Sequence, residues 1–306
     1  MKVLVTGASG FLGSHILREN PEFLGIDIKS DVARVFVGDI KDENLLAKLI
    51  RENEITRIVH LAGVQYSTYV PPRKRESYFS ENVKMAEALK NVALKTNIEQ
   101  IIYVSTDMVY GSEIKSPVVE SCLPKPIGEY GKSKLEAENI LLSAHNLKVI
   151  VIRPRLILGF GRVGTIKKLA RLIASPIPVI LIGNGRNRYQ FIAASDLSNA
   201  ILKFLNSNLT GIFNIGSQNP PNLNELFSKV FRALGKKKSM VHVPASIAIS
   251  LLNILDTLSI SPLAPEQFRI AALDYELDTS KIEYTISWKP EFSDDQILTL
   301  TLKNLL

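Results

Sequence analysis

The sequence predicts an α/β fold: a doubly wound parallel sheet followed by a smaller, mainly helical C-terminal lobe. Short β-branched runs alternate with longer helical patterns through the first half of the chain. These runs are apolar almost throughout, as expected of strands that are covered on both faces. The first run also leads directly into a glycine-rich loop and a helical pattern, so its neighbours in the sheet should be parallel.

The elements follow in order along the chain. The strand over 2–6 precedes the glycine loop, and a helix over 12–19 follows it. Further apolar runs predict strands at 23–28, 35–37, 58–61, 101–105 and 149–152, with helices at 43–52, 81–96 and 132–145 between them. After Pro154 the pattern loosens into loops rich in Gly and Pro, and helices are predicted at 195–205, 223–234 and 247–258.

Composition limits the classes of protein. With 46% hydrophobic and 22% charged residues, the 306-residue chain is neither disordered, collagen-like nor a coiled coil. The single cysteine, Cys122, excludes an internal disulfide and a multi-thiolate site, and no metal is expected. No targeting segment is apparent, so the protein is expected in the cytoplasm. The net charge of +7 suggests an anionic partner.

The most apolar stretch lies at 247–260. Asn253 and Asp256 interrupt it, and it is shorter than the ~20 residues that a membrane span needs. It contains no Lys or Arg, which an interfacial membrane helix normally carries. We therefore predict a buried or amphipathic helix here, and no membrane partner.

The glycine-rich loop is a candidate for anion binding. Gly7 and Gly10 allow a tight turn and a close approach of the backbone to a pyrophosphate, and Gly13 allows close packing of helix on strand. Phe11 and Leu12 open the helix, whose first N–H groups point toward the anion. The spacing is GxxGxxG rather than GxGxxG, so the loop alone is weak support for a Rossmann-type dinucleotide site.

An acid at the end of the second strand strengthens this interpretation. Asp27 lies twenty residues after Gly7, where a carboxylate accepts hydrogen bonds from the adenosine ribose hydroxyls and repels a 2′-phosphate. Ile28 follows it and offers no cation there. NAD is therefore favoured over NADP, although Lys29 keeps the alternative open.

The third and fourth strands end in residues that belong to the same site if the sheet is doubly wound. Asp39 would accept from the adenine amino group, and Ile40 would cover a face of the ring. His60 is interpreted as a packed histidine rather than a catalytic base. After it comes a segment against which a cofactor can lie on bare backbone: Leu61, Ala62 and Gly63.

A tyrosine and a lysine form the candidate catalytic pair. Tyr130 and Lys134 are four residues apart at the start of a predicted helix, so both project from one face. A cation beside a phenol lowers its pKa, which would let Tyr130 act as a general base near neutral pH. Thr106 follows the fifth strand and is placed to hydrogen-bond the substrate oxygen that is oxidised.

Taken together, these motifs resemble the extended short-chain dehydrogenase/reductases, in particular the NAD-dependent sugar-nucleotide epimerase/dehydratase group. The resemblance extends beyond the first lobe, and its matching segments are colinear over almost the whole chain: 7–13, 27, 38–40, 60–63, 105–111, 130–134, 153–154, 183–197, 213–217 and 288–290.

The resemblance implies roles for these residues. Tyr130 is the general base and acid, Lys134 orients it and holds the nicotinamide ribose, and Thr106 contacts the substrate. Ser105 and Pro154 join the residues above in NAD binding, and Thr106, Asp107 and Arg188 bind a nucleotide sugar, with Arg188 on the diphosphate. It also implies an NAD-binding Rossmann domain at 1–160, to which a segment near 186–215 returns, and a substrate-binding lobe at 161–306.

Two departures from the family narrow the reaction. The related 4,6-dehydratases have Asp-Glu after the hydroxyl residue, whereas Asp107 is followed here by Met108, so dehydration is disfavoured. Leu156 stands where the group usually has an asparagine, which leaves the sugar undetermined. The expected reaction is inversion at C4 through a transient keto-sugar, with hydride passing to NAD and back.

Other functions stay open. The first is an NAD-dependent dehydrogenase or reductase of a sugar or steroid-like alcohol, with the 247–260 helix lining an apolar pocket. A non-catalytic dinucleotide sensor is disfavoured because the catalytic pair is present. The basic runs at 73–75 and 236–238 lack interleaved aromatic residues, so solvated loops explain them better than nucleic-acid binding. The helices at 81–96 and 132–145 either form a homodimer interface or cover the sheet.

Overall fold

The structure is a computed structural model, and it describes residues 2–66, 69–162 and 164–306. Seven parallel strands form the central sheet, in the spatial order β10-β6-β5-β4-β1-β2-β3. The first strand lies inside the sheet, and the chain winds outward from it in both directions. The doubly wound sheet is therefore confirmed. Its strands are β1 (Val3–Thr6), β2 (Leu24–Asp27), β3 (Val35–Val37), β4 (Arg57–His60), β5 (Gln100–Val104), β6 (Lys148–Pro154) and β10 (Gly211–Ile215).

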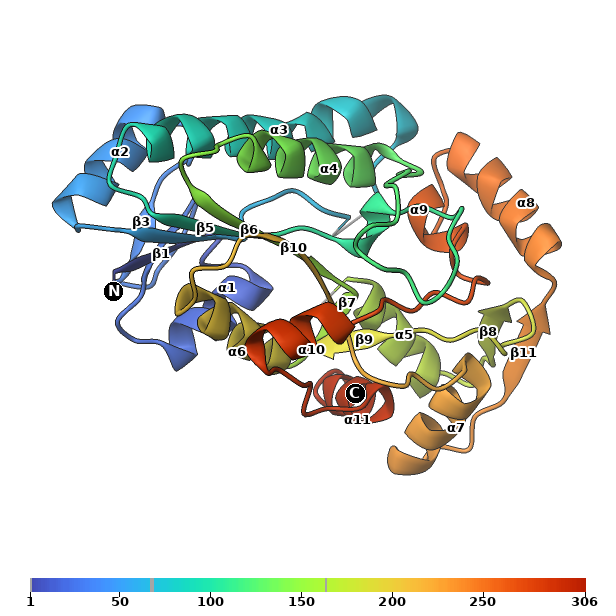
Figure 1. Ribbon diagram of the computed structural model, residues 1–306. Coiled ribbons are helices and arrows are strands. Elements are labelled where there is room, and N and C mark those ends of the chain that lie inside the picture. The colour runs from blue at the N-terminus through green and yellow to red at the C-terminus, as the bar shows by residue number, and fades with distance from the viewer. Residues whose placement is uncertain (1, 67–68, 163) are drawn as a thin grey trace.

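Helices cover both faces of this sheet (Figure 1). One layer consists of α2 (Glu43–Glu52), α3 (Pro72–Leu94) and α4 (Glu129–Leu142), and the opposite layer of α1 (Phe11–Glu19), α6 (Ala194–Leu205) and α10 (Ser280–Ile286). Two apolar cores lie between the helices and the sheet, one on each side. The buried faces of α3 and α4 contribute to one of these cores, so their apolar side chains cover the sheet, as the sequence left open.

The rest of the chain forms a smaller lobe beside the carboxyl ends of the strands. It has its own apolar core and two short parallel sheets, one of β7 (Leu156–Leu158) with β9 (Phe191–Ala193) and one of β8 (Val179–Ile182) with β11 (Met240–Val243). Its helices are α5 (Thr165–Ala174), α7 (Leu223–Ala233), α8 (Ala245–Thr257), α9 (Pro265–Phe268) and α11 (Asp294–Lys303). A short 3-10 helix, η1 (Asp107–Val109), follows β5.

Parts of the C-terminal half belong to the large sheet. Strand β10 pairs with β6, and α6 packs against α1, where the sequence placed a returning segment. Trp288 is also buried in the core on the α1 side, and its Nε1 donates to the carbonyl of Asp196 at 3.1 Å. The division at residue 160 stays a prediction, but the core on this side draws on residues from both halves of the chain.

Helix α3 begins earlier than expected. It starts at Pro72 rather than at residue 81, because proline is well suited to the first turn of a helix, where its missing N–H is not needed. The basic run 73–75 therefore lies on a helix, and the prediction of a solvated loop is wrong. Arg75 is buried and pairs with Asp256 of α8, with Nη2 and Oδ1 2.5 Å apart.

Helix α8 begins and ends within two residues of its predicted bounds, and of the two predicted alternatives it is the amphipathic helix. Only two of its residues are buried, and a stripe of large apolar side chains faces solvent, among them Ile247, Leu251, Ile254 and Leu258. Because Asp256 lies on the opposite side of the helix and points toward α3, the apolar stripe points away from the protein. The alternative of a buried helix is wrong. Within the described residues, no helix combines the length and the apolar character that crossing a membrane would require.

Candidate active site

The glycine loop after β1 packs tightly against the end of β4. Gly7 has φ = +68°, a conformation that favours glycine, and a Cβ there would lie 2.7 Å from the backbone N of Ala62. A Cβ on Gly13 would lie 2.3 Å from the carbonyl O of Gly7, so the start of α1 approaches the loop closely. Helix α1 has no side-chain cap and no acid in its first turn. Its first N–H groups are therefore available to an anion, as dinucleotide binding requires.

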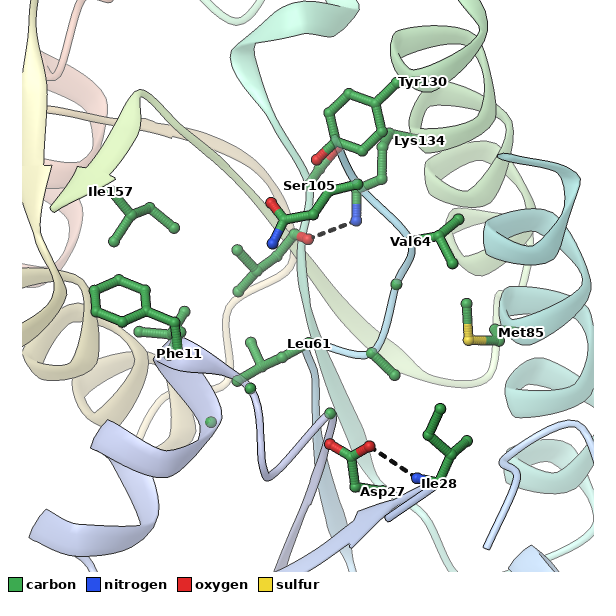
Figure 2. Close-up of a pocket in the computed structure, with 18 of the residues that line it drawn as sticks. Phe11, Asp27, Ile28, Leu61, Val64, Met85, Ser105, Tyr130, Lys134 and Ile157 are labelled. Carbon is green, nitrogen blue, oxygen red and sulfur yellow. Dashed lines mark hydrogen bonds between the residues drawn. The ribbon is translucent and has the colours of Figure 1, made fainter. Parts of the chain in front are cut away.

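A first cavity of about 310 Å³ lies above this loop. Figure 2 shows that it runs from Asp27 and Ile28 at one end to Tyr130 and Lys134 at the other. The shape and the glycine cradle fit an extended dinucleotide. Most residues predicted to bind the cofactor line this cavity, namely Gly7, Gly10, Phe11, Leu12, Gly13, Asp27, Ile28, Leu61, Ala62, Gly63, Ser105, Tyr130 and Lys134.

Asp27 is fixed at the end of the cavity by backbone groups. Its Oδ2 accepts from the N–H of Ser9 at 2.9 Å, and its Oδ1 accepts from the N–H of Ile28 at 2.8 Å. A carboxylate oxygen can accept more than one hydrogen bond, so both oxygens retain capacity for ribose hydroxyls. Ile28 is exposed and lines the cavity, and it brings no cation there.

Three predicted cofactor residues are not part of this cavity. Asp39 pairs with Lys41 and accepts from its backbone N–H at 3.0 Å. Ile40 is 4% exposed and belongs to the core beneath α2 and α3. Both follow β3, the edge strand, and neither lines the cavity. Pro154 lines the neighbouring cavity instead.

The candidate catalytic pair lies on α4, where the sequence placed it. Lys134 is buried, and its Nζ donates to the carbonyl of Val104 at 2.9 Å and lies 4.1 Å from the centroid of the Tyr103 ring. Figure 2 shows Tyr130 and Lys134 on the same side of the cavity, next to Ser105. Burial lowers the pKa of Lys134 to about 7, since a charged ammonium is poorly solvated there.

The predicted lowering of the Tyr130 pKa is wrong for this structure. Burial raises the pKa of Tyr130 well above its ordinary value, and the negative charges of Glu266 and Asp107 raise it further. Arg162 and a hydrogen bond with Thr106 act in the opposite direction and are smaller. Burial of the phenolate is the largest influence on this pKa, so the nearby Lys134 does not bring the pKa below its ordinary value.

A second cavity of about 280 Å³ adjoins the first. Tyr130 and Ser105 line both cavities, so the phenol lies where they meet. Thr106 and Asp107, predicted to contact substrate, line the second cavity. Its other lining residues come from η1, β6, β7, the smaller lobe and the segment after β4, and include Tyr66, Met108, Pro154, Arg155, Leu156, Tyr189, Leu263, Gln267 and Ala271.

Asp107 is engaged in a buried ion pair. Arg155 Nη1 donates to its Oδ2, and Thr106 Oγ1 donates to its Oδ1 at 3.3 Å. The guanidinium of Arg155 lies over the rings of Tyr189 and Tyr275, 4.6 and 4.4 Å from their centroids. Neither Arg155 nor this pairing was anticipated from the sequence. The sequence signal available for Arg155 was its position directly after Arg153-Pro154, the pair that resembles the family's motif.

Arg188 does not reach either cavity, contrary to its predicted role on a diphosphate. Its side chain is half exposed and forms ion pairs with Asp274 and Glu276 on a neighbouring strand-like segment. Arg162, which lies in a glycine-rich loop and was not predicted as a site residue, lines both cavities instead. Its Nε is buried and has no hydrogen-bond partner among the residues that the structure describes.

His60 is packed in the core, as interpreted from the sequence. It is 1% exposed, hydrogen-bonds Thr6 Oγ1 at 2.7 Å and stacks on Tyr103. Burial and the charge of Lys134 lower its pKa to about 3. A histidine held neutral in this way stabilises the sheet rather than serving as the base.

Comparisons with known proteins find similar sequences and similar structures. The model of a family described as "NAD dependent epimerase/dehydratase family" matches residues 3–216. The uncharacterised protein y4nG of Sinorhizobium fredii is 26% identical over 97% of this chain and 77% of its own length. The UDP-glucose 4-epimerase of Streptococcus mutans is 25% identical over 96% of this chain and 93% of the enzyme. The solved structure of the UDP-glucose 4-epimerase of Thermotoga maritima with UDP-glucose has a TM-score of 0.79 at 23% identity, over 99% of this chain and 98% of that one.

Proposed function

This chain belongs to the NAD-dependent epimerase/dehydratase family, and from that premise we propose that it is a nucleotide-sugar epimerase that inverts C4 of the sugar. When bound, NAD supplies a hydride acceptor that also returns the hydride. The position of Tyr130 between the two cavities carries the proposal. One phenol there can exchange a proton with a sugar hydroxyl on one side while it faces the cofactor site on the other.

The residues around Tyr130 have separate roles in binding the cofactor and the substrate. Lys134 holds the nicotinamide ribose, and the glycine loop with Asp27 holds the pyrophosphate and adenosine end. Thr106 lies within hydrogen-bonding reach of Tyr130 and lines the substrate side, so it orients the hydroxyl that loses its proton. A bound substrate also excludes water from this position, which strengthens each polar contact.

Epimerisation is favoured over dehydration by the state of Asp107. Elimination of water needs an acid and a base beside the sugar, and Met108 stands where the dehydratases have their glutamate. Both oxygens of Asp107 are engaged, one by Arg155 and one by Thr106. It is the only carboxylate among the residues that line the second cavity in the described structure, so no pair of carboxyl groups is available.

The alternative of a dehydrogenase for a steroid-like alcohol loses its structural support. It depended on an apolar pocket lined by residues 247–260, but none of these residues lines either cavity among the described parts of the chain. The second cavity contains arginine, aspartate, glutamine and tyrosine side chains, which suit a polar substrate better.

We assign the substrate phosphates to Arg162. It lines both cavities, carries a buried N–H that no described residue pairs with, and its guanidinium carbon lies 5.3 Å from the centroid of the Phe11 ring at the start of α1. Guanidinium groups bind phosphate through paired hydrogen bonds. Arg188 is already neutralised by two acids and cannot serve in the same way.

A homodimer and a location in the cytoplasm stay predictions. The apolar sides of α3 and α4 cover the sheet, so a dimer would use their outer, more polar sides. Size-exclusion chromatography with light scattering gives the oligomeric state directly.

The proposed reaction is tested by incubating the purified protein separately with UDP-glucose, UDP-galactose and UDP-glucuronic acid. We expect inversion at C4 of at least one of them, detected by NMR, without net release of NADH. Stoichiometric NADH would show a dehydrogenase, and loss of water from the sugar would show a dehydratase. Either result would overturn the proposal.

A further inference from the structure

Helix α4 carries both catalytic candidates but lacks a cap of its own. Its N-cap residue is Gly128, which has no side chain to accept from the first N–H groups of the helix. Those N–H groups have no partner within the helix, and leaving them buried and unpaired is costly. Tyr130 is the second residue of α4, so the cap also determines where its backbone lies.

The missing acceptor comes from the smaller lobe. Oε1 of Glu266, on α9, accepts from the N–H of Tyr130 at 3.0 Å and of Gly131 at 3.4 Å. Glu266 is 2% exposed and lies 136 positions after Tyr130 in the chain. A Cβ on Gly128 would lie 2.2 Å from this Oε1, so glycine at the N-cap makes room for the carboxyl group.

The second oxygen of Glu266, Oε2, is buried and forms no hydrogen bond with any described residue. The titratable groups that influence Glu266, or are influenced by it, come from three segments: Arg75 of α3, Tyr66 after β4, and Glu129, Tyr130 and Lys132 of α4. Arg75, the strongest of the cations, is already paired with Asp256.

We propose that Glu266 is a positioning residue for the reaction: it caps the catalytic helix from across the lobe boundary, and its charge acts on the phenol of Tyr130. The proposal rests on the proposed function in taking Tyr130 as the base. An ionised Glu266 disfavours the phenolate, and a protonated one does not. Burial raises the pKa of Glu266 to about 7, so this change of charge falls in the physiological range.

Two substitutions separate the cap from the charge. Glu266→Gln keeps an oxygen acceptor for the two N–H groups and removes the charge, whereas Glu266→Ala removes both. We expect Glu266→Gln to keep kcat within about threefold and to move the acidic limb of the kcat/KM profile to lower pH by at least half a unit. We expect Glu266→Ala to lower kcat at least tenfold, with a smaller change in KM. Glu225→Gln, an exposed acid in the first turn of α7, is the matched control and should change neither.

A second readout needs no substrate. The pKa of Glu266 is higher in the folded protein than its ordinary value of 4.5, so the folded state holds an extra proton between about pH 4.5 and 7. The stability that this proton adds is present below pH 4.5 and is lost as the pH rises to 7. As the pH rises from 4.5 to 7, the melting temperature of the wild type should therefore fall relative to that of Glu266→Gln.

The outcomes are distinguishable. Identical pH profiles for wild type and Glu266→Gln, or a Glu266→Ala enzyme as active as Glu266→Gln, would overturn the proposal. A pH-independent difference in melting temperature would do so too. If the melting temperatures behave as expected and no nucleotide sugar is converted, the proposed function fails while the buried, titrating cap stands.

Discussion

The phenol of Tyr130 faces both cavities, so its removal should stop chemistry without emptying either. Tyr130→Phe keeps the ring that packs against Tyr66 and Phe79 and removes only the oxygen. We expect NAD affinity within about twofold of wild type and a kcat lower by ~10²–10⁴, the usual contribution of positioned proton transfer. Calorimetric titration with NAD and an NMR assay of C4 inversion measure the two quantities. Activity reduced only a few-fold would show that another group is the base.

Two arginines give a second prediction at this scale. Arg162→Ala should raise the KM for the nucleotide sugar roughly 10- to 100-fold, since hydrogen bonds to charged groups contribute about 1.5–3 kcal/mol. Arg188→Ala is the control, because the guanidinium of Arg188 forms ion pairs with Asp274 and Glu276 at the surface. A KM that rises for Arg188→Ala but not for Arg162→Ala would return the phosphate site to the position expected from the sequence.

The sequence brought Gly7 and Asp27 to one cavity because both lie at the carboxyl ends of neighbouring parallel strands, which meet at one edge of the sheet. Asp39 and Ile40 also come after a strand, but β3 is the edge strand and neither residue lines the cavity. Sequence reasoning also failed where a tertiary contact decides. The pairing of Arg155 with Asp107 and the approach of Glu266 to Tyr130 join segments distant in the chain, and no local pattern encodes them.

At the scale of elements, the start of α1 is the most constrained feature. Gly13→Ala places a Cβ 2.3 Å from the carbonyl of Gly7, which the backbone can relieve only by moving the helix away from the loop. Overpacking of this kind costs about 1–3 kcal/mol, so NAD affinity should fall roughly 5- to 100-fold. Ser14→Ala, one residue later, removes only a hydroxyl that bonds back to Phe11 and should bind NAD normally. Equal affinities for the two variants would contradict the tight packing.

Strands β1 to β6 and helices α1, α2, α4 and α6 were predicted to within a few residues, because the alternation of period and polarity is strong there. Helix α3 begins nine residues before its predicted start, and the bounds of α8 were predicted to within two residues while its burial was left open. The first turns of α3 are polar and basic, so they lack an apolar stripe, and the ion pair of Arg75 with Asp256 links them to the smaller lobe. The apolar pattern of α8 indicates burial, yet its stripe faces solvent, because amphipathicity shows that a helix has an apolar side and not what covers it.

At the scale of the whole molecule, the ion pair of Arg75 with Asp256 links α3, which covers the large sheet, to α8 of the smaller lobe. Both side chains are about 10% exposed, and Tyr69 OH also donates to Asp256 Oδ1 at 3.0 Å. Asp256→Asn leaves Arg75 without its counter-charge, and breaking such a pair should lower the free energy of unfolding by about 3 kcal/mol. Urea unfolding followed by fluorescence of Trp288 measures this loss.

The surface pair of Lys125 with Glu113 is the reference for that measurement. Both side chains are more than half exposed at a separation of 2.9 Å, and Glu113→Gln should cost less than about 1 kcal/mol. If Asp256→Asn proves no more damaging than Glu113→Gln, the contact between the lobes does not depend on this ion pair.

Because β10 comes late in the sequence, the large sheet stays incomplete while the protein is being synthesised. The strand that closes the sheet beside β6 is synthesised more than fifty residues after it, once β7, α5, β8, β9 and α6 have been made. Until then β6 presents an open edge, the part of a sheet most prone to pair with another chain. Because translation delivers about 5–20 residues per second, that edge stays open for seconds on the ribosome. Chaperones that shield the nascent chain should therefore affect the yield most between the synthesis of β6 and β10.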